Sequence, residues 1–184
     1  MPGRTDDVAD PALAADLLLA RRGQAFYARV LGDLPDRDLA GPSRVPGFSR
    51  ARIVAHVALE AREVARVVEA VRTSDDPPSL AAPGARRDEI DFAATLPAEA
   101  LRNLAAHAAV HLNVEWRDLP ADGWRRPIRT AGAAEITPWS TVRHRARELW
   151  GRALDLDGVA LERDVPPEIL GGLPLPNPFT ARSL

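Results

Sequence analysis

The sequence predicts an all-α fold: an antiparallel four-helix bundle with one small β excursion between its third and fourth helices. Four segments show the three- and four-residue spacing of apolar side chains that marks one face of a helix. Each segment begins at a capping residue or a proline. The chain of 184 residues is also long enough to bury a core as one domain without disulfides.

The first two helices have clear start signals. The first is expected to begin at Pro11, where Asp10 supplies the cap and proline suits the first helical position, and to end near residue 34. The second is expected to begin after Ser49 and to end near Thr73. Its apolar positions recur at helical intervals: Ile53, Val57, Val64, Val67, Val68 and Val71.

The third and fourth helices also have start and end signals in the sequence. A third helix is expected from Pro97 to about Leu119. The segment between it and the next helix, 123–136, has a central glycine among bulky residues and predicts a small hairpin. Thr137 and the proline after it start the fourth helix, which Gly158 ends.

The domain prediction follows from these limits. Residues 1–10 are expected to be an N-terminal tail, 11–160 the bundle and 161–184 a proline-rich C-terminal tail. The composition of 74–87 is that of a loop.

Composition excludes several function classes. All 24 basic residues are arginine, so the chain has no lysine for a Schiff base or a phosphate loop, and it has no cysteine nucleophile. A net charge of −2 argues against nucleic acid as a partner. No stretch is apolar enough to span a membrane, and the acidic start does not look like a signal peptide, so we expect a cytoplasmic protein.

The fourth helix carries the densest group of polar side chains. His144, Glu148 and Arg152 follow one another at four-residue intervals and therefore form one stripe along the helix. A stripe of this kind is commonly a solvated face of ion pairs worth a few tenths of a kcal/mol. It could equally border the core, because the apolar positions of the same helix lie close to it.

Three further histidines lie on the second and third helices. His56 adjoins the core position Val57 and lies one turn before Glu60, which suits a boundary residue bonded to a neighbour. His107 and His111 have the four-residue spacing of two imidazoles that share a metal, but the alternative is a pair that faces solvent.

Three segments together resemble the mycothiol-dependent maleylpyruvate isomerase family of the DinB-like four-helix superfamily. They are VPGFSRARIVAHVALEAREVARVVEA, GWRRPIRTAG and RELWGRALDLDG. Within residues 11–170, the most specific pieces are the PGFS that precedes His56 and the Arg147-Glu148 dipeptide. Some members of the family have a further C-terminal domain, for which the 26 residues after Gly158 are too few.

The resemblance implies a zinc site with one departure. In the family, a histidine on the second helix and a glutamate and a histidine one turn apart on the fourth hold the ion. These positions correspond to His56, Glu148 and Arg152 in this chain. A guanidinium has no lone pair for a metal, so Arg152 cannot be a ligand.

Three outcomes are compatible with this departure from the family pattern. His144 could supply the missing imidazole beside His56 and Glu148, or those two residues could hold an ion with waters. Alternatively the metal is lost, and Arg152 neutralises Glu148 and clamps a substrate carboxylate.

The function that the resemblance implies is a thiol-dependent isomerase or transferase that uses mycothiol, and zinc if it is retained, on a small unsaturated, anionic metabolite. In this hypothesis Arg143, Arg147 and Arg152 bind the acid group, while His56 or His144 moves a proton and Glu148 completes the catalytic group. The alternatives are a metal-free biosynthetic isomerase or cyclase and a non-catalytic small-molecule-binding module. A homodimer is compatible with the sequence.

Overall fold

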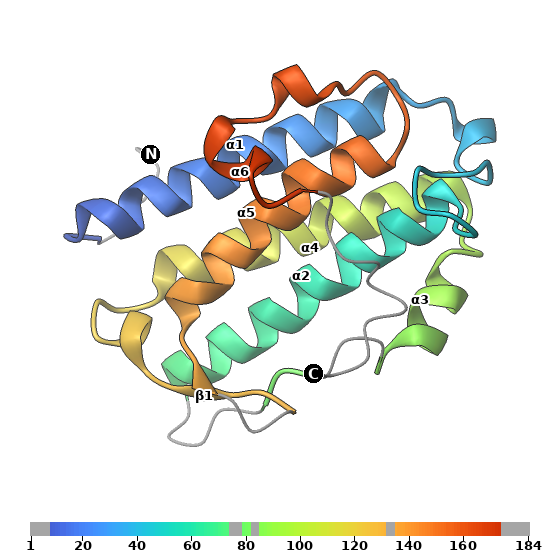
Figure 1. Ribbon diagram of the computed structural model, residues 1–184. Helices are drawn as coiled ribbons and strands as arrows, with labels where there is room; N and C mark the ends of the chain where they lie inside the picture. The colour runs from blue at the N-terminus through green and yellow to red at the C-terminus, as the bar shows by residue number, and fades with distance from the viewer. Residues whose placement is uncertain (1–7, 74–78, 82–84, 132–134, 174–184) are drawn as a thin grey trace, which may run out of the picture.

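The computed structural model describes residues 8–73, 79–81, 85–131 and 135–173. Its architecture is a bundle of four long helices with a two-stranded antiparallel sheet at one end (Figure 1). The helices are α1 (Pro11–Asp33), α2 (Arg50–Thr73), α4 (Ala98–Asp118) and α5 (Pro138–Asp155), and the strands are β1 (Ile128–Arg129) and β2 (Glu135–Ile136). The predicted fold class is confirmed, including the hairpin between the third and fourth bundle helices.

The long helices begin where the sequence predicts. Asp10 accepts a hydrogen bond from the backbone N–H two residues ahead at 3.0 Å. Ser49 accepts one from the N–H three residues ahead at 3.2 Å. Thr137 and Ser140 cap each other's backbone N–H groups. These bonds satisfy N–H groups that have no partner within the helix, which is why short polar residues mark the starts.

The helices pack as two pairs. In the first pair α1 and α5 run in the same direction, since Asp16 accepts a hydrogen bond from Trp139 near their starts and Phe26 stacks on Trp150 farther along both. In the second pair α2 runs parallel to α4, because Arg72 near the end of α2 reaches Glu115 near the end of α4. The bundle is antiparallel between the two pairs.

The connection from α2 to α4 contains a helix that the sequence does not predict. Helix α3 (Arg87–Ala93) has only seven residues, too few to show a helical period, and it buries Ile90. It is held against α2 by an ion pair between Arg52 and Asp91 at 2.6 Å.

The first part of the expected C-terminal tail is folded. It contains a 3₁₀ turn, η3 (Glu162–Asp164), and a short helix, α6 (Pro167–Leu170), and it buries Val165 and Ile169 in the hydrophobic core. Residues 174–184 lie outside the described part of the chain. Among the described helices, none has the length and apolar character that crossing a membrane requires.

Close packing of α1 on α5 depends on Gly23. A Cβ atom there would lie 2.8 Å from Nε1 and 2.9 Å from Cδ1 of the buried Trp150. We expect Gly23→Ala to lower the free energy of unfolding by about 1–3 kcal/mol, because the indole has to shift. At Gly32 in the same helix nothing lies within 4 Å of the added atom. Gly32→Ala should therefore raise stability by up to about 1 kcal/mol. Urea unfolding that gave both variants the same sign would contradict this account.

Candidate functional site

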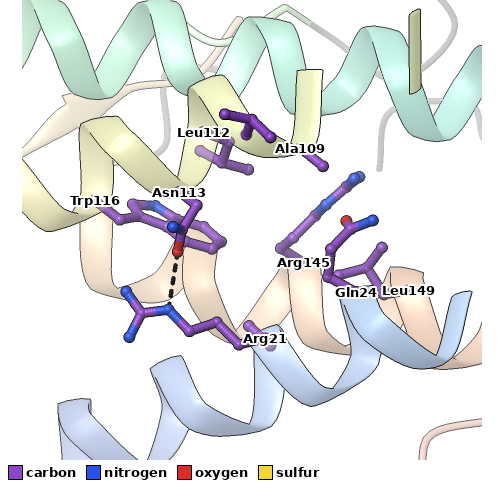
Figure 2. A pocket seen from close by; sticks show the side chains of 10 residues that line it. Arg21, Gln24, Ala109, Leu112, Asn113, Trp116, Arg145 and Leu149 are labelled. Carbon is purple, nitrogen blue, oxygen red and sulfur yellow. Dashed lines mark hydrogen bonds between the residues drawn. The ribbon is translucent and has the colours of Figure 1, made fainter. Parts of the chain in front are cut away.

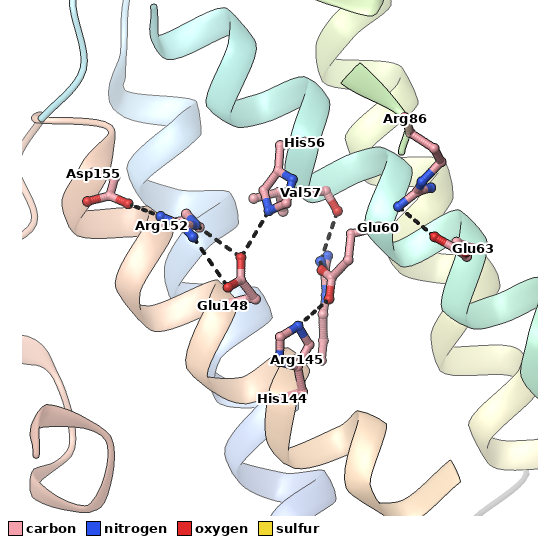
Figure 3. Close-up of polar contacts among 10 residues, drawn as sticks. All are labelled: His56, Val57, Glu60, Glu63, Arg86, His144, Arg145, Glu148, Arg152 and Asp155. Carbon is pink, nitrogen blue, oxygen red and sulfur yellow. Dashed lines mark hydrogen bonds and ion pairs between the residues drawn. The ribbon is translucent and has the colours of Figure 1, made fainter. Parts of the chain in front are cut away.

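The predicted site residues of α2 and α5 meet where these helices cross. His56 Nε2 lies 3.1 Å from Glu148 Oε2, and the two side chains are 14% and 8% exposed (Figure 3). They point toward each other across the interface between the two helices. A carboxylate in this position fixes the orientation of the imidazole ring.

The predicted ion pair between Glu148 and Arg152 is also present. Arg152 donates from Nε to Glu148 Oε2 at 3.0 Å and from Nη2 to Oε1 at 3.4 Å. Its Nη1 donates to Asp155 Oδ2 at 2.7 Å, and the side chain is only 1% exposed. Each of its three nitrogens is thus bonded to a carboxylate. This leaves Arg152 poorly suited to the substrate-clamping role that the sequence suggested.

The surroundings of this pair favour the charged form of both members. Burial alone would raise the pKa of Glu148, but the hydrogen bond with His56 and the charge of Arg152 outweigh it and hold the pKa below its ordinary value. Burial would lower the pKa of Arg152, but the Glu148 carboxylate raises it. Glu148 and Arg152 therefore favour their charged forms and are hydrogen-bonded to each other in a buried position.

A second carboxylate lies one turn farther along α2. Glu60 Oε2 accepts a 2.5 Å bond from Nη1 of Arg145, which also donates to the carbonyl of Val57 at 2.8 Å. Nε2 of His144 lies 3.2 Å from Glu60 Oε1. Arg145 is buried with 2% of its side chain exposed, whereas His144 is 62% exposed. One buried carboxylate thus has two cationic neighbours.

The charges of this second group are set by their contacts. Burial would raise the pKa of Glu60, but Arg145 and His144 together bring it well below its usual range. The contact with Glu60 raises the pKa of His144 to about 9, against the opposing effects of partial burial and Arg145. His144 therefore carries a positive charge at neutral pH.

Glu60 and Arg145 are not among the site residues that the sequence predicts, although a signal for Glu60 is present. Helix α2 has the motif His56-x₃-Glu60, and α5 has His144-x₃-Glu148. Where two such helices cross antiparallel, each histidine faces the glutamate of the other helix. The structure contains both of these pairs.

Arg143 and Arg147, the other predicted acid-binding residues, are not gathered with His56. Arg143 lies 3.4 Å from Asp16 of α1. Arg147 lies beside Gly172, which follows α6. Both are exposed on the side of α5 that faces α1 and the C-terminal segment.

The residues present do not fit the zinc site that the resemblance implies. A zinc ligand needs a free lone pair, and at the third position Arg152 has none to offer. Its guanidinium instead occupies both oxygens of Glu148. The substitute ligand His144 is turned to Glu60, so the suggested set of His56, Glu148 and His144 is not brought together around one point.

A different group on the α2–α4 side has ligand atoms close together. Glu69, His111 and Glu115 each offer one atom within 4.8 Å of the others. Arg72 donates to Glu115 at 3.1 Å, and its charge opposes a cation there. The predicted alternative for His107 and His111, two side chains that face solvent, agrees with their exposure.

A pocket of about 290 Å³ lies between α1, α4 and α5 (Figure 2). Its lining is mainly apolar, with Leu112, Trp116 and Leu149, and Arg21 donates a 2.9 Å hydrogen bond to Asn113 at its edge. Arg145 lines this pocket as well as binding Glu60, so the pocket and the polar cluster share that side chain.

The chain is similar to known proteins over most of this framework. Residues 20–157 match the family described as the mycothiol maleylpyruvate isomerase N-terminal domain. A crystal structure of the mycothiol-dependent maleylpyruvate isomerase is 34% identical, with a TM-score of 0.79, over 85% of this chain and 65% of that one. A mutant of that isomerase with one histidine changed to alanine matches at 33% identity and a TM-score of 0.80, with the same coverage.

The chain thus spans 65% of the length of these solved structures. No curated protein sequence matches it. The family match covers well over half of the chain and includes both helices that carry the His–Glu pairs. The chain therefore belongs to the family of mycothiol maleylpyruvate isomerase N-terminal domains.

Proposed function

We propose that this protein is a thiol-dependent isomerase or thiol transferase that acts on a small, unsaturated, anionic metabolite. The observation that carries the proposal is the His56–Glu148 pair, which lies largely covered where α2 crosses α5 on the framework of this family. The solved structure of a mycothiol-dependent maleylpyruvate isomerase, at 34% identity, supports mycothiol as the thiol.

In this proposal the thiol supplies the nucleophile, because the chain has no cysteine of its own. The thiolate would add to the double bond of the substrate, the new single bond would rotate, and elimination would release the isomer and the thiolate. His56 takes the thiol proton at the start and returns it at the end. Glu148 orients the imidazole and stabilises it while it is protonated.

Arg152 has a supporting role in this scheme. Because the donor set does not fit zinc, none of these steps uses a metal. The guanidinium supplies the positive charge that keeps Glu148 ionised in a buried position, and Asp155 fixes the guanidinium in turn.

A second function has one observation in its favour. Each carboxylate of the cluster already has a cationic partner within the protein, as in structural ion-pair networks. A non-catalytic module that binds small molecules with the same framework would look the same.

Turnover by the purified protein separates the two functions. We expect isomerisation of maleylpyruvate to require added mycothiol and to be slowed about 100-fold or more by His56→Asn, because a general base contributes factors of that size. His107→Asn removes an exposed histidine of α4 and should leave the rate unchanged. The measurement is the loss of the cis substrate by chromatography, with and without the thiol.

Two results would contradict this proposal. If the folded protein binds the substrate but gives no thiol-dependent product, the binding module is the correct function. If His56→Asn turns over at the wild-type rate, His56 is not the base.

A further inference from the structure

The pocket between α1, α4 and α5 is separate from the His56–Glu148 pair, and neither of these two residues lines it. Its volume of about 290 Å³ is at the small end of the range for pockets that hold small molecules. Most of its wall is apolar, with Leu112 and Trp116 from α4 and Leu149 from α5. A ligand with a small apolar body therefore fits this space, and the polar side chains of the wall determine which polar group that ligand carries.

Arg145 is the buried charged side chain of this wall, with 2% of its side chain exposed. Its hydrogen bonds to the protein all leave from Nη1, which donates to the carbonyl of Val57 and to the carboxylate of Glu60. Among the described residues, Nε and Nη2 have no hydrogen-bond partner. Neither atom is one of the fully enclosed side-chain atoms that lack a partner, so both keep some accessible surface. Because buried polar groups are normally hydrogen-bonded, these two donors point to a ligand.

The two nitrogens form one edge of the guanidinium group. In arginine, the N–H of Nε and one N–H of Nη2 point in the same direction, at the spacing of the two oxygens of a carboxylate. A carboxylate binds this edge with two parallel hydrogen bonds, which a hydroxyl group or a single carbonyl oxygen cannot do. Gln24 of α1 lies at the same end of the pocket as Arg145 (Figure 2). Its amide also has no hydrogen-bond partner among the residues that the structure describes.

We propose that this pocket is a second small-molecule site, which takes an aromatic or other apolar monocarboxylic acid. The carboxylate of the ligand accepts hydrogen bonds from Nε and Nη2 of Arg145, with the amide of Gln24 beside it. The apolar body of the ligand packs on Trp116 and Leu149. The site goes beyond the proposed function, because none of its residues belongs to the proposed catalytic group.

The charges around Arg145 are compatible with an anion held by oriented donors. Glu60 balances the charge of Arg145 from the side of α2, so the attraction comes from the aligned N–H groups and not from a surplus positive charge. None of the described residues that line the pocket is acidic, whereas Arg21 lines it at the other end. A carboxylate therefore meets no like charge on the wall, and a cationic ligand finds no counterion there.

Calorimetric titration of the full chain with 2-naphthoate, a two-ring carboxylic acid, tests the site. Arg145→Lys keeps a cation for Glu60 but loses the edge of two nitrogens. We expect it to bind 2-naphthoate about 10- to 100-fold more weakly than wild type, the size of a lost charge-assisted pair. The neutral 2-naphthamide should bind wild type more weakly than the acid and should not distinguish wild type from Arg145→Lys.

A second variant tests the pocket without changing any charge. Ala109 lines the pocket, and Ala109→Phe fills part of it with a ring. This variant should bind 2-naphthoate at least about 10-fold more weakly than wild type. Ala14→Phe adds the same ring at an exposed alanine of α1 outside the pocket and should bind like wild type. Circular dichroism checks that each variant is folded.

Three results would overturn the inference. They are no saturable binding of 2-naphthoate by wild type, equal affinity of Ala109→Phe and Ala14→Phe, and equal affinity of wild type and Arg145→Lys. If Arg145→Lys does not fold, equal binding of the acid and the amide by wild type takes the place of the third. All of these results concern binding alone, so thiol-dependent turnover can succeed or fail independently of them.

Discussion

Removing one partner of the Glu148–Arg152 pair is expected to destabilise the protein by about 3–5 kcal/mol, because the charge left behind is buried without its counterion. Glu148→Gln leaves the Arg152 guanidinium, 1% exposed, with Asp155 alone. Arg152→Met leaves the Glu148 carboxylate, 8% exposed, with His56 alone. Denaturant unfolding at neutral pH measures both losses.

The double variant distinguishes a buried pair from a surface contact. Glu148→Gln combined with Arg152→Met removes both charges, so we expect it to be less destabilised than the worse single variant. Arg37→Met is the matched control, since Arg37 pairs with Asp38 at 3.7 Å with 85% of its side chain exposed. It should change stability by no more than about 0.5 kcal/mol. Strictly additive losses in the double variant would show that the two residues do not act as a pair.

Arg152→His is expected to create or strengthen a zinc site. The new imidazole would lie one turn from Glu148 and on the same side of α5, with His56 facing it from α2. Three neutral or anionic ligands would then replace the guanidinium, which removes the fixed positive charge. We expect zinc to bind this variant at least about 100-fold more tightly than wild type, and to raise its thermal stability because the metal binds the folded form.

Two controls make the zinc titration specific. Arg152→Gln removes the same guanidinium without adding a ligand and should bind zinc no better than wild type. Carrying out every titration in a His111→Asn background removes the group of Glu69, His111 and Glu115 from the measurement. Equal zinc affinity in all variants would mean that residue 152 does not occupy a ligand position.

The site could be predicted from the sequence only in part. His56 and Glu148 were identifiable because their positions match family motifs on helices whose limits are fixed by local signals. The Arg152 ion pair was also predictable, because a residue four positions away on a helix is always a neighbour. The Glu60 group was not identified, since its contacts with His144 and Arg145 cross from one helix to another.

The features that follow from the sequence alone are local ones. Caps at Asp10, Ser49 and Thr137 and the apolar periods set where the long helices begin, because these bonds join residues two or three positions apart. The residue types also limit the possible reactions, because the chain has no thiol or lysine and Arg152 has no lone pair for a metal.

Which charged side chains meet depends on how the helices pack. The antiparallel crossing of α2 and α5 joins His56 to Glu148 and Glu60 to His144. It also determines that Arg152 is enclosed while His144 remains exposed. These contacts join residues more than 80 positions apart, so their distances depend on how the helices pack and not on any spacing along the chain.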